Sequence, residues 1–170
     1  MEFKKYIRDI NDFPKQGIVF KDITPLLNNA KVFEEATNAL YNLIKDKKID
    51  KVVGLESRGF FFAPLLASKL NAGFIPIRKP GKLPSEVLSK SYALEYGSDI
   101  LEIHTDSIVP GERILLHDDV LATGGTAMTA CELITALGGE IVQCNFLIEL
   151  DFLNGREKIA EFNIASLLHY

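Results

Sequence analysis

The spacing of hydrophobic positions along this chain changes repeatedly between a helical and an extended pattern. Apolar residues recur every three or four positions from about Lys31 to Lys47, which predicts an amphipathic helix. Ser57 is placed to cap a second helix that continues to Leu70, and Gly138 with Gly139 marks the end of a third. Short apolar runs between these helices predict strands at Lys51–Leu55, Gly73–Ile77, Ile114–Val120 and Glu140–Leu150.

The alternation of strands with helices determines the expected fold class. Strands joined through helices form βαβ units, whose strands run parallel and are covered by helices. We therefore expect an α/β fold in which helices flank a mainly parallel, twisted sheet. A length of 170 residues fits one domain with its own core, so residues 1–170 are expected to form a single domain.

Two segments interrupt this alternation. Strand-like runs at Tyr92–Tyr96 and Ile100–His104 surround a Gly-Ser-Asp turn, which predicts an inserted antiparallel hairpin within residues 85–106. A hairpin beside a basic loop rich in Pro and Gly is a plausible lid. The segment Phe13–Ile23, within an N-terminal stretch of about residues 1–30, has turn residues followed by an apolar run, and its pattern alone favours an edge strand.

The most informative motif is the run ILLHDDVLATGGT, from Ile114 to Thr126. Its apolar start suits a strand that is buried on both faces, and Asp118 and Asp119 fall toward the carboxyl end of that strand, where α/β sheets bind ligands. The glycines that follow let successive backbone N–H groups point at an anion, beside the positive end of a helix dipole. A tight turn without a ligand is the alternative, but adjacent carboxylates repel each other and gain nothing from such a turn.

Composition and charge exclude several classes of protein. Apolar residues make up 47% and charged residues 25% of the chain, as in ordinary globular proteins. The net charge of −4 disfavours binding to nucleic acid, which usually requires a basic face. No run approaches the roughly 20 apolar residues of a membrane span, and MEFKKYIRDI lacks the core of a signal peptide. Cys131 and Cys144 lack metal-site spacing and indicate buried free thiols in a reducing cytoplasm.

The motif closely resembles the phosphoribosyl pyrophosphate signature of type I phosphoribosyltransferases, in which two acids precede a turn rich in threonine and glycine. The ESRGF run from Glu56, the YALEYG run from Tyr92 and the FPKQGIVFKDI loop from Phe13 narrow the resemblance to the adenine phosphoribosyltransferases. The similarity extends from about Ile7 to Tyr170. It implies transfer of a phosphoribosyl group to adenine, giving AMP and pyrophosphate, through an oxocarbenium-like transition state.

The resemblance assigns the ribose 5-phosphate to the signature motif. Asp118 and Asp119 would accept hydrogen bonds from the ribose hydroxyls and favour positive charge on the sugar. The 5′-phosphate would be bound by Ala122, Thr123, Gly124, Gly125, Thr126 and Ala127.

The departing pyrophosphate requires cations. The resemblance places Ser57 and Arg58 beside it, together with the basic loop that contains Arg78, Lys79 and Lys82. Mg²⁺ would arrive bound to the substrate, because this ion keeps several waters and prefers phosphate oxygens, so no dedicated metal site is expected. By composition alone, the basic loop fits a solvated charged turn equally well, and Arg58 also suits the start of a surface helix.

Base recognition rests on the resemblance. Val19 and Lys21 would contact adenine through backbone groups, Phe20 would stack on it, and Glu95 would handle a purine-ring proton, with Tyr96 as part of the lid. Glu95 also suits the exposed face of a strand. A 6-oxo purine such as xanthine would present the opposite hydrogen-bonding pattern and leave buried groups unpaired.

Two rival functions remain to be weighed. An enzyme acting on a 6-oxo purine would keep the same chemistry, while a transcription regulator sensing phosphoribosyl pyrophosphate would need a DNA-binding helix-turn-helix that is not detectable here. The family resemblance also implies a homodimer. His117, directly before Asp118, either faces the site or packs under the sheet, and packing is the favoured interpretation.

Overall fold

The computed structural model describes residues 2–93 and 98–170. These form two compact units, Met1–Ala39 and Leu40–Tyr170. Within the described residues, none of the helices combines the length and apolar character that a membrane span requires.

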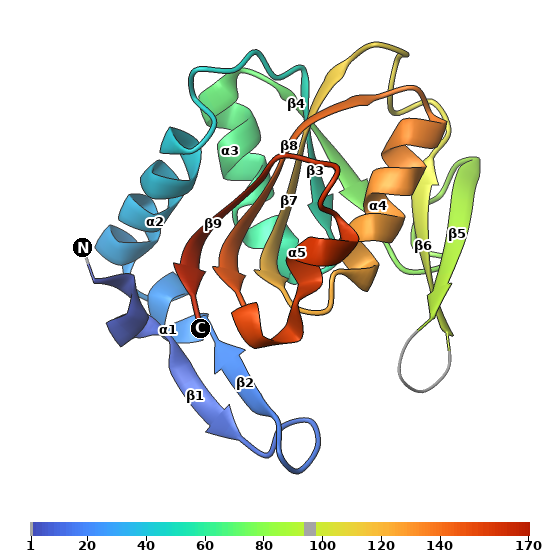
Figure 1. Ribbon diagram of the computed structural model, residues 1–170. Coiled ribbons are helices and arrows are strands. Elements are labelled where there is room, and N and C mark those ends of the chain that lie inside the picture. Colours follow the sequence, from blue (N-terminus) through green and yellow to red (C-terminus); the bar gives the residue numbers. More distant parts are fainter. Residues whose placement is uncertain (1, 94–97) are drawn as a thin grey trace. The chain divides into compact units, whose positions relative to one another are not determined.

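The second unit contains a parallel sheet that runs through its centre (Figure 1). In the described part of the chain this sheet has five strands in the order β4-β3-β7-β8-β9. The strands are β3 (Lys51–Leu55), β4 (Gly73–Ile77), β7 (Arg113–Leu121), β8 (Glu140–Glu149) and β9 (Ile164–His169). Because all of them run parallel, their carboxyl ends lie along one edge of the sheet.

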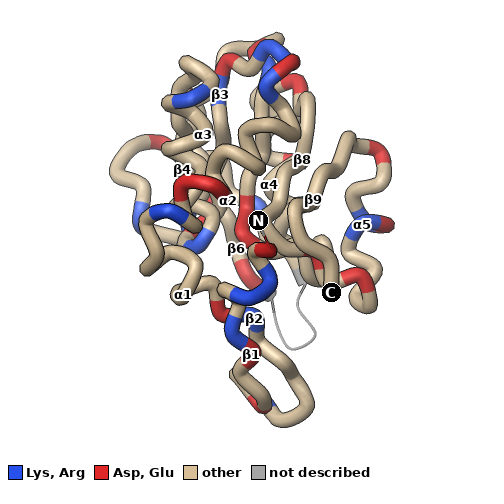
Figure 2. Tube along the Cα trace, turned by 90° about the vertical axis from the view of Figure 1, so that its left-hand side faces the viewer, with Lys and Arg blue, Asp and Glu red and all other residues tan. Residues whose placement is uncertain are grey.

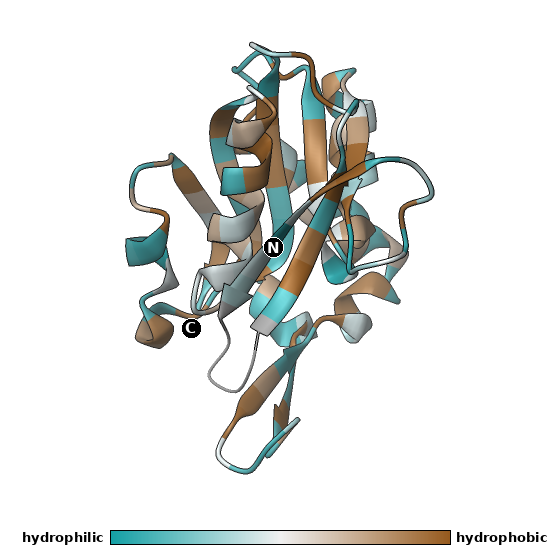
Figure 3. Cartoon of the chain, turned by 90° about the vertical axis from the view of Figure 1, so that its right-hand side faces the viewer, coloured by the Kyte–Doolittle hydropathy of each residue, from teal (hydrophilic) through white to brown (hydrophobic). Residues whose placement is uncertain are grey.

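Helices cover both faces of this sheet. The short η2 (Arg58–Phe61) and α3 (Ala63–Leu70) follow β3 on one face, and α4 (Gly125–Ala136) follows β7 on the other (Figure 1). The central strands β3, β7 and β8 carry buried apolar side chains at successive positions, as a doubly covered strand requires, and they are brown along much of their length in Figure 3. Leu116, Ile134 and Phe146 lie fully buried in the core.

A hairpin and a C-terminal segment complete the second unit. Strands β5 (Val87–Ala93) and β6 (Ser98–His104) pair antiparallel, and β5 contacts α4. Between β8 and β9 lie η3 (Asp151–Leu153) and α5 (Gly155–Lys158).

The first unit is built around a second small hairpin. It contains η1 (Phe3–Tyr6), β1 (Arg8–Asn11), β2 (Val19–Asp22) and α1 (Thr24–Leu27), and α2 (Ala30–Asn42) leads into the second unit. Charged residues of both signs lie side by side on β1 and β2 (Figure 2). One example is the ion pair of Lys21 with Asp9, at 2.7 Å.

The fold class predicted from the sequence is confirmed, including the parallel sheet, the flanking helices and the inserted hairpin. Several details differ from the predictions. The Phe13–Ile23 segment does not supply an edge strand of the main sheet; its strand β2 pairs with β1 instead. Ser57 makes no capping hydrogen bond, because the chain first forms the 3-10 turn η2 before α3 begins. The helix predicted to extend to Lys47 ends at Asn42.

Candidate active site

The candidate site lies where the order of strands in the sheet reverses. The chain passes from β3 outward to β4 and later returns to place β7 on the other side of β3. The segments that follow β3 and β7 therefore diverge, and in open α/β sheets ligands bind in the space between such segments. Glu56, Ser57 and Arg58 follow β3 at this point, and the threonine- and glycine-rich loop follows β7.

This loop, residues 122–127, joins β7 to α4 and is called the phosphate loop below. A small pocket of about 70 Å³ lies against it, lined by Asp118 and by Val120–Thr126. Gly124 has φ +79°, in the left-handed region that favours glycine, and caps α4. The pocket therefore combines backbone N–H groups at the start of a helix with two threonine hydroxyls, which suits a phosphate group.

Asp118 and Asp119 lie on β7 itself, and the second of them is almost fully buried. Burial, followed by the charge of Asp119, raises the pKa of Asp118 well above its usual range. Burial also raises the pKa of Asp119, although the charge of Arg58 opposes that rise. The pair therefore favours an added positive charge in the pocket, because a cationic partner would offset both the burial and the mutual repulsion.

Arg58 lies beside these acids. Its Nε is 2.9 Å from Oδ2 of Asp119, so the arginine predicted at the pyrophosphate contacts a predicted ribose-binding acid in this structure. The close approach depends on Gly59, since a Cβ there would lie 3.0 Å from Oδ1 of Asp118 and from the carbonyl oxygen of His117. The 3-10 turn is thus packed directly against the acidic end of β7.

His117 packs within the core of the second unit. It is fully buried, its ring contacts Phe62, and its Nδ1 is 2.9 Å from Oδ1 of Asn145. Burial lowers the pKa of His117 to about 4, and the hydrogen bond to Asn145 only partly offsets this effect. The favoured interpretation of His117 as a packing residue is confirmed.

The basic loop, residues 78–84, is held by Glu56. The Arg78 Nε lies 3.2 Å from Glu56 Oε2, the Lys79 N–H donates to the same oxygen over 2.9 Å, and Lys82 pairs with Oε1. Burial raises the pKa of Glu56, but these hydrogen bonds outweigh it and bring the pKa below its usual range. The basic loop is therefore held by a network of ion pairs and hydrogen bonds. It is not the solvated charged turn that the composition alone fitted equally well.

Tyr92 of the hairpin connects the basic loop with the phosphate loop. Its hydroxyl accepts from Lys79 over 3.3 Å and from Thr126 over 3.4 Å, and it donates to Asp99 over 3.2 Å. The Lys79 ammonium also pairs with Asp99. Lys79, predicted at the pyrophosphate, and Thr126, predicted at the 5′-phosphate, thus contact the same hydroxyl within the second unit.

The residues predicted to recognise the base lie in the first unit. Val19, Phe20 and Lys21 form most of β2, where the Phe20 ring meets the Phe13 ring edge-on, with centroids 5.1 Å apart. Val19 is exposed at the surface of this unit. Glu95 and Tyr96, the predicted acid/base and lid residues, lie outside the described residues.

Three residues of this network were missed by the sequence analysis, namely Glu56, Tyr92 and Asp99. Each had a signal in the sequence. Glu56 directly follows a predicted strand at the ligand edge, as Arg58 does two residues later. Tyr92 and Asp99 face each other in the hairpin register, but the sequence analysis placed Asp99 in the turn.

Comparison with known proteins identifies the same family that the sequence motifs resemble. A model of the phosphoribosyl transferase domain matches residues 22–161. The adenine phosphoribosyltransferase of Flavobacterium johnsoniae is 63% identical over 170 residues, covering all of both chains.

Solved structures agree with this result. The crystal structure of adenine phosphoribosyltransferase from Thermoanaerobacter pseudethanolicus aligns with a TM-score of 0.97 at 48% identity, over 99% of this chain and 98% of that one. The enzyme from Saccharomyces cerevisiae, crystallised with adenine and an imino-altritol bisphosphate, aligns with a TM-score of 0.92 at 42% identity, over 98% and 96% of the two chains.

Proposed function

This chain belongs to the phosphoribosyl transferase family, and we propose that within it the chain acts as an adenine phosphoribosyltransferase. It transfers the phosphoribosyl group of phosphoribosyl pyrophosphate to adenine, giving AMP and pyrophosphate. The observation that carries this function is the pairing of Asp118 and Asp119 with the phosphate-loop pocket, in a chain whose curated relatives are adenine phosphoribosyltransferases over its full length.

The sugar would bind with its 5′-phosphate in the pocket lined by Val120–Thr126 and with its hydroxyls on the two acids. As the bond from C1 to pyrophosphate breaks, positive charge builds on the ribose. Asp118 and Asp119 would stabilise that charge, because a positive charge beside two buried acids offsets the cost of their burial and their mutual repulsion.

The pyrophosphate would be received by Ser57, Arg58 and the basic loop. Arg78 and Lys82 are paired with Glu56 and Lys79 is paired with Asp99, so the leaving group would exchange places with carboxylates or share these cations with them. The ion pairs keep the cations oriented before the substrate arrives, which lowers the entropic cost of ordering these side chains on binding.

Mg²⁺ fits this site as an ion carried by the substrate. Asp118 is the carboxylate that lines the pocket, and Mg²⁺ typically takes one or two carboxylates together with phosphate oxygens and water. We propose that phosphoribosyl pyrophosphate brings the ion and that it neutralises charge on the leaving group.

Recognition of adenine is proposed for Val19, Phe20 and Lys21 of β2. Support comes from the exposed position of Val19 and from the aromatic ring of Phe20, a group that can stack on a base. Lys21 pairs through Nζ with Asp9, and its proposed contact with the base runs through its backbone. Glu95 would exchange the purine proton, and Tyr96 would close over the site.

A homodimer is proposed for this chain. Large apolar side chains are exposed on η2, α3 and β4, at Phe61, Leu65 and Phe74 respectively. An association that buries such residues would be favourable. Sedimentation at several concentrations would test it, and a single species with the mass of one chain at every concentration would contradict it.

We also propose that the enzyme works in the cytoplasm. Cys131 and Cys144 are free thiols with sulfur atoms 3.6 Å apart, as a reducing compartment would keep them.

A panel of bases tests the proposed function. The protein, Mg²⁺ and phosphoribosyl pyrophosphate would be mixed with adenine, hypoxanthine, guanine or xanthine, and pyrophosphate release measured. We expect release with adenine alone. Release with a 6-oxo purine but not with adenine would overturn the base assignment, and no release with any base would favour a sensor of phosphoribosyl pyrophosphate.

A further inference from the structure

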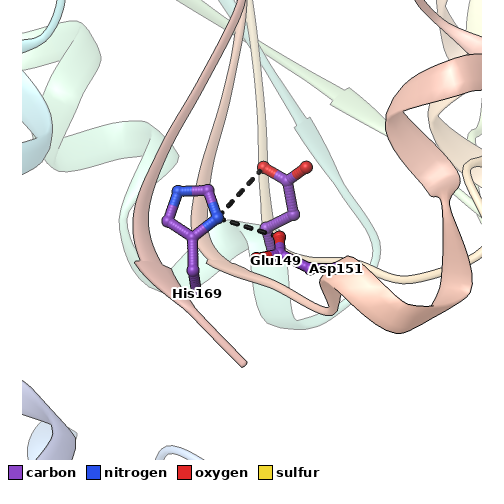
Figure 4. A group of neighbouring side chains, drawn as sticks. All are labelled: Glu149, Asp151 and His169. Atoms are coloured by element: carbon purple, nitrogen blue, oxygen red, sulfur yellow. Dashed lines mark hydrogen bonds and ion pairs between the residues drawn. The ribbon is translucent and has the colours of Figure 1, made fainter.

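A cluster of titratable side chains at the ends of β8 and β9 has no part in the proposed reaction. Glu149, Asp151 and His169 lie there with ligand atoms within 4.8 Å of one another (Figure 4). Nδ1 of His169 is 2.9 Å from Asp151 and 3.9 Å from Glu149. A group of this composition would suit a metal ion if its oxygens were available.

The contacts of Glu149 show that its oxygens serve another purpose. Nε of Arg156 donates to Oε1 over 2.8 Å, while Nη2 of Arg156 and the Ser166 hydroxyl each donate to Oε2 over 2.6 Å. Burial raises the pKa of Glu149, but the hydrogen bonds from Arg156 and Ser166 outweigh it and lower the pKa. A metal ion here would have to displace a bidentate guanidinium, so the cluster is better suited to holding Arg156.

Arg156 is adjacent in sequence to Gly155, and Gly155 lies directly against the phosphate loop. A Cβ built at residue 155 would lie 2.0 Å from the carbonyl oxygen of Ala122 and 2.9 Å from the backbone nitrogen of Gly124. From the other side, a Cβ at residue 124 would lie 2.4 Å from the carbonyl oxygen of Gly155. The two backbones therefore meet with no room for a side chain on either.

The need for glycine at residue 155 comes from this contact and not from backbone conformation. The left-handed residue at this turn is Asn154, with φ +51°, and Gly155 is the first residue of α5. Glycine is unfavourable within helices compared with alanine, so local propensity would favour a side chain here. The close approach of the phosphate loop is what forbids one.

We propose that Gly155, fixed in place by the Arg156–Glu149 ion pair, is a positioning residue for the phosphate loop. The contact sets where the backbone of Ala122 and Gly124 lies, and hence where its N–H groups can meet the 5′-phosphate. This inference rests on the proposed function for the identity of the ligand. It assigns a role to Gly155, which lies about 30 residues after the phosphate loop in the sequence. That role is to position the loop and not to take part in the reaction.

The experiment is the Gly155→Ala substitution. We expect the KM for phosphoribosyl pyrophosphate to rise about 10- to 100-fold, because small displacements of binding groups have effects of this size. The KM for adenine should stay within about twofold of the wild type, which distinguishes a displaced phosphate loop from general damage. Binding of ribose 5-phosphate alone, followed by calorimetry without base, should weaken in parallel with the KM for phosphoribosyl pyrophosphate.

Two further variants complete the design. Glu157→Ala changes an exposed residue of the same short helix and should keep wild-type values. Arg156→Lys keeps the positive charge but loses the bidentate geometry, so it should weaken ribose 5-phosphate binding less than Gly155→Ala does.

Each outcome decides between the alternatives. Wild-type affinity for ribose 5-phosphate in folded Gly155→Ala would overturn the proposal, as would an equal rise in both KM values. If circular dichroism shows that Gly155→Ala is unfolded, a folded Arg156→Lys variant with wild-type affinity would overturn it. Loss of folding in both variants would show that the segment serves the fold alone, again overturning the proposal. A wild-type protein that binds ribose 5-phosphate but shows no turnover with adenine would overturn the proposed function only.

Discussion

The phosphate loop and the basic loop occupy the same edge of the sheet, but different forces hold them. The phosphate loop is fixed by backbone packing, since Gly124 and Gly155 meet with no space between them. The basic loop is fixed by side-chain ion pairs from Arg78 and Lys82 to the single carboxylate of Glu56. The phosphate loop depends on steric fit at its contact with Gly155, behind which lies the Arg156–Glu149 ion pair, and the basic loop depends on its ion pairs with Glu56.

This difference has consequences for how each loop responds to its surroundings. Steric contacts between buried backbones are insensitive to salt and pH, whereas pairs between partly exposed charges are screened by ions. The fixed loop would bind the part of the substrate that stays on the product, and the adaptable loop would bind the part that leaves. The following substitutions test this contrast, from the largest expected effect to the smallest.

Asp118→Asn should have the largest effect, on the rigid side of the site. Loss of a carboxylate that stabilises positive charge in the transition state should lower turnover about 100- to 1000-fold. Thermal unfolding should be little changed, because asparagine has the size of aspartate and removes the repulsion with Asp119. Steady-state assays with adenine measure the effect, and wild-type turnover in the folded variant would contradict the role of this acid.

His117→Asn tests whether the rigid side also limits stability at low pH. The lower pKa of buried His117, about 4 against 6.5 when unfolded, means that the unfolded chain binds its proton first as pH falls. The contribution of neutral His117 to the free energy of unfolding is therefore fully present above pH 6.5. It is lost as the pH falls from 6.5 to 4, and the loss is about 3 kcal/mol.

The measurement is the free energy of unfolding in urea across this pH range for both proteins. Asparagine can still donate to Asn145 but does not titrate, so the variant should lose less stability than the wild type on acidification. Parallel pH curves for the two proteins would show that His117 does not titrate as proposed.

Glu56→Gln tests the electrostatic side. Without its charge, Arg78 and Lys82 lose their common partner, and the KM for phosphoribosyl pyrophosphate should rise about tenfold, the size expected for one charge-assisted hydrogen bond. Glu112→Gln is a matched control, since Glu112 pairs with Lys51 over 3.6 Å just before β7, at the opposite edge of the sheet. Equal effects in both variants would mean that the basic loop does not need Glu56.

Lys82→Ala should have the smallest effect. The Lys82 side chain is 46% exposed, so its contribution is screened, and the KM for phosphoribosyl pyrophosphate should rise no more than about fivefold. The difference from wild type should shrink as salt is added. A difference that persists unchanged in 1 M salt, where the Debye length is about 3 Å, would show that the contribution of Lys82 does not depend on its charge.

Much of the fold could be predicted from local patterns, for physical reasons. Buried parallel strands are continuous apolar runs, so β3 and β4 were predicted at their observed boundaries. The start of α2 follows from helical spacing, but its early end at Asn42 does not, because the apolar pattern continues to Ile44. The pairing of β2 with β1 was missed, since pairing between short strands depends on partners that the pattern of one segment does not reveal.

The candidate site was predictable where chemistry is concentrated in one segment. Asp118, Asp119 and the phosphate loop are contiguous, so their composition alone indicated a sugar phosphate. Glu56 was missed although it follows a predicted strand, because its partners lie in a loop that only the fold brings to it.

The sequence by itself determined the class of fold, the loop that suits a phosphate and the two acids beside it. Those properties depend on periodicity and on neighbouring residues, which a linear pattern contains. Only the tertiary structure decided that Glu56 organises the basic loop, that Tyr92 joins it to Thr126, and that Gly155 must lack a side chain. Each of these depends on segments 13 or more residues apart meeting at one sheet edge, and distance in space is set by the packing of the whole unit.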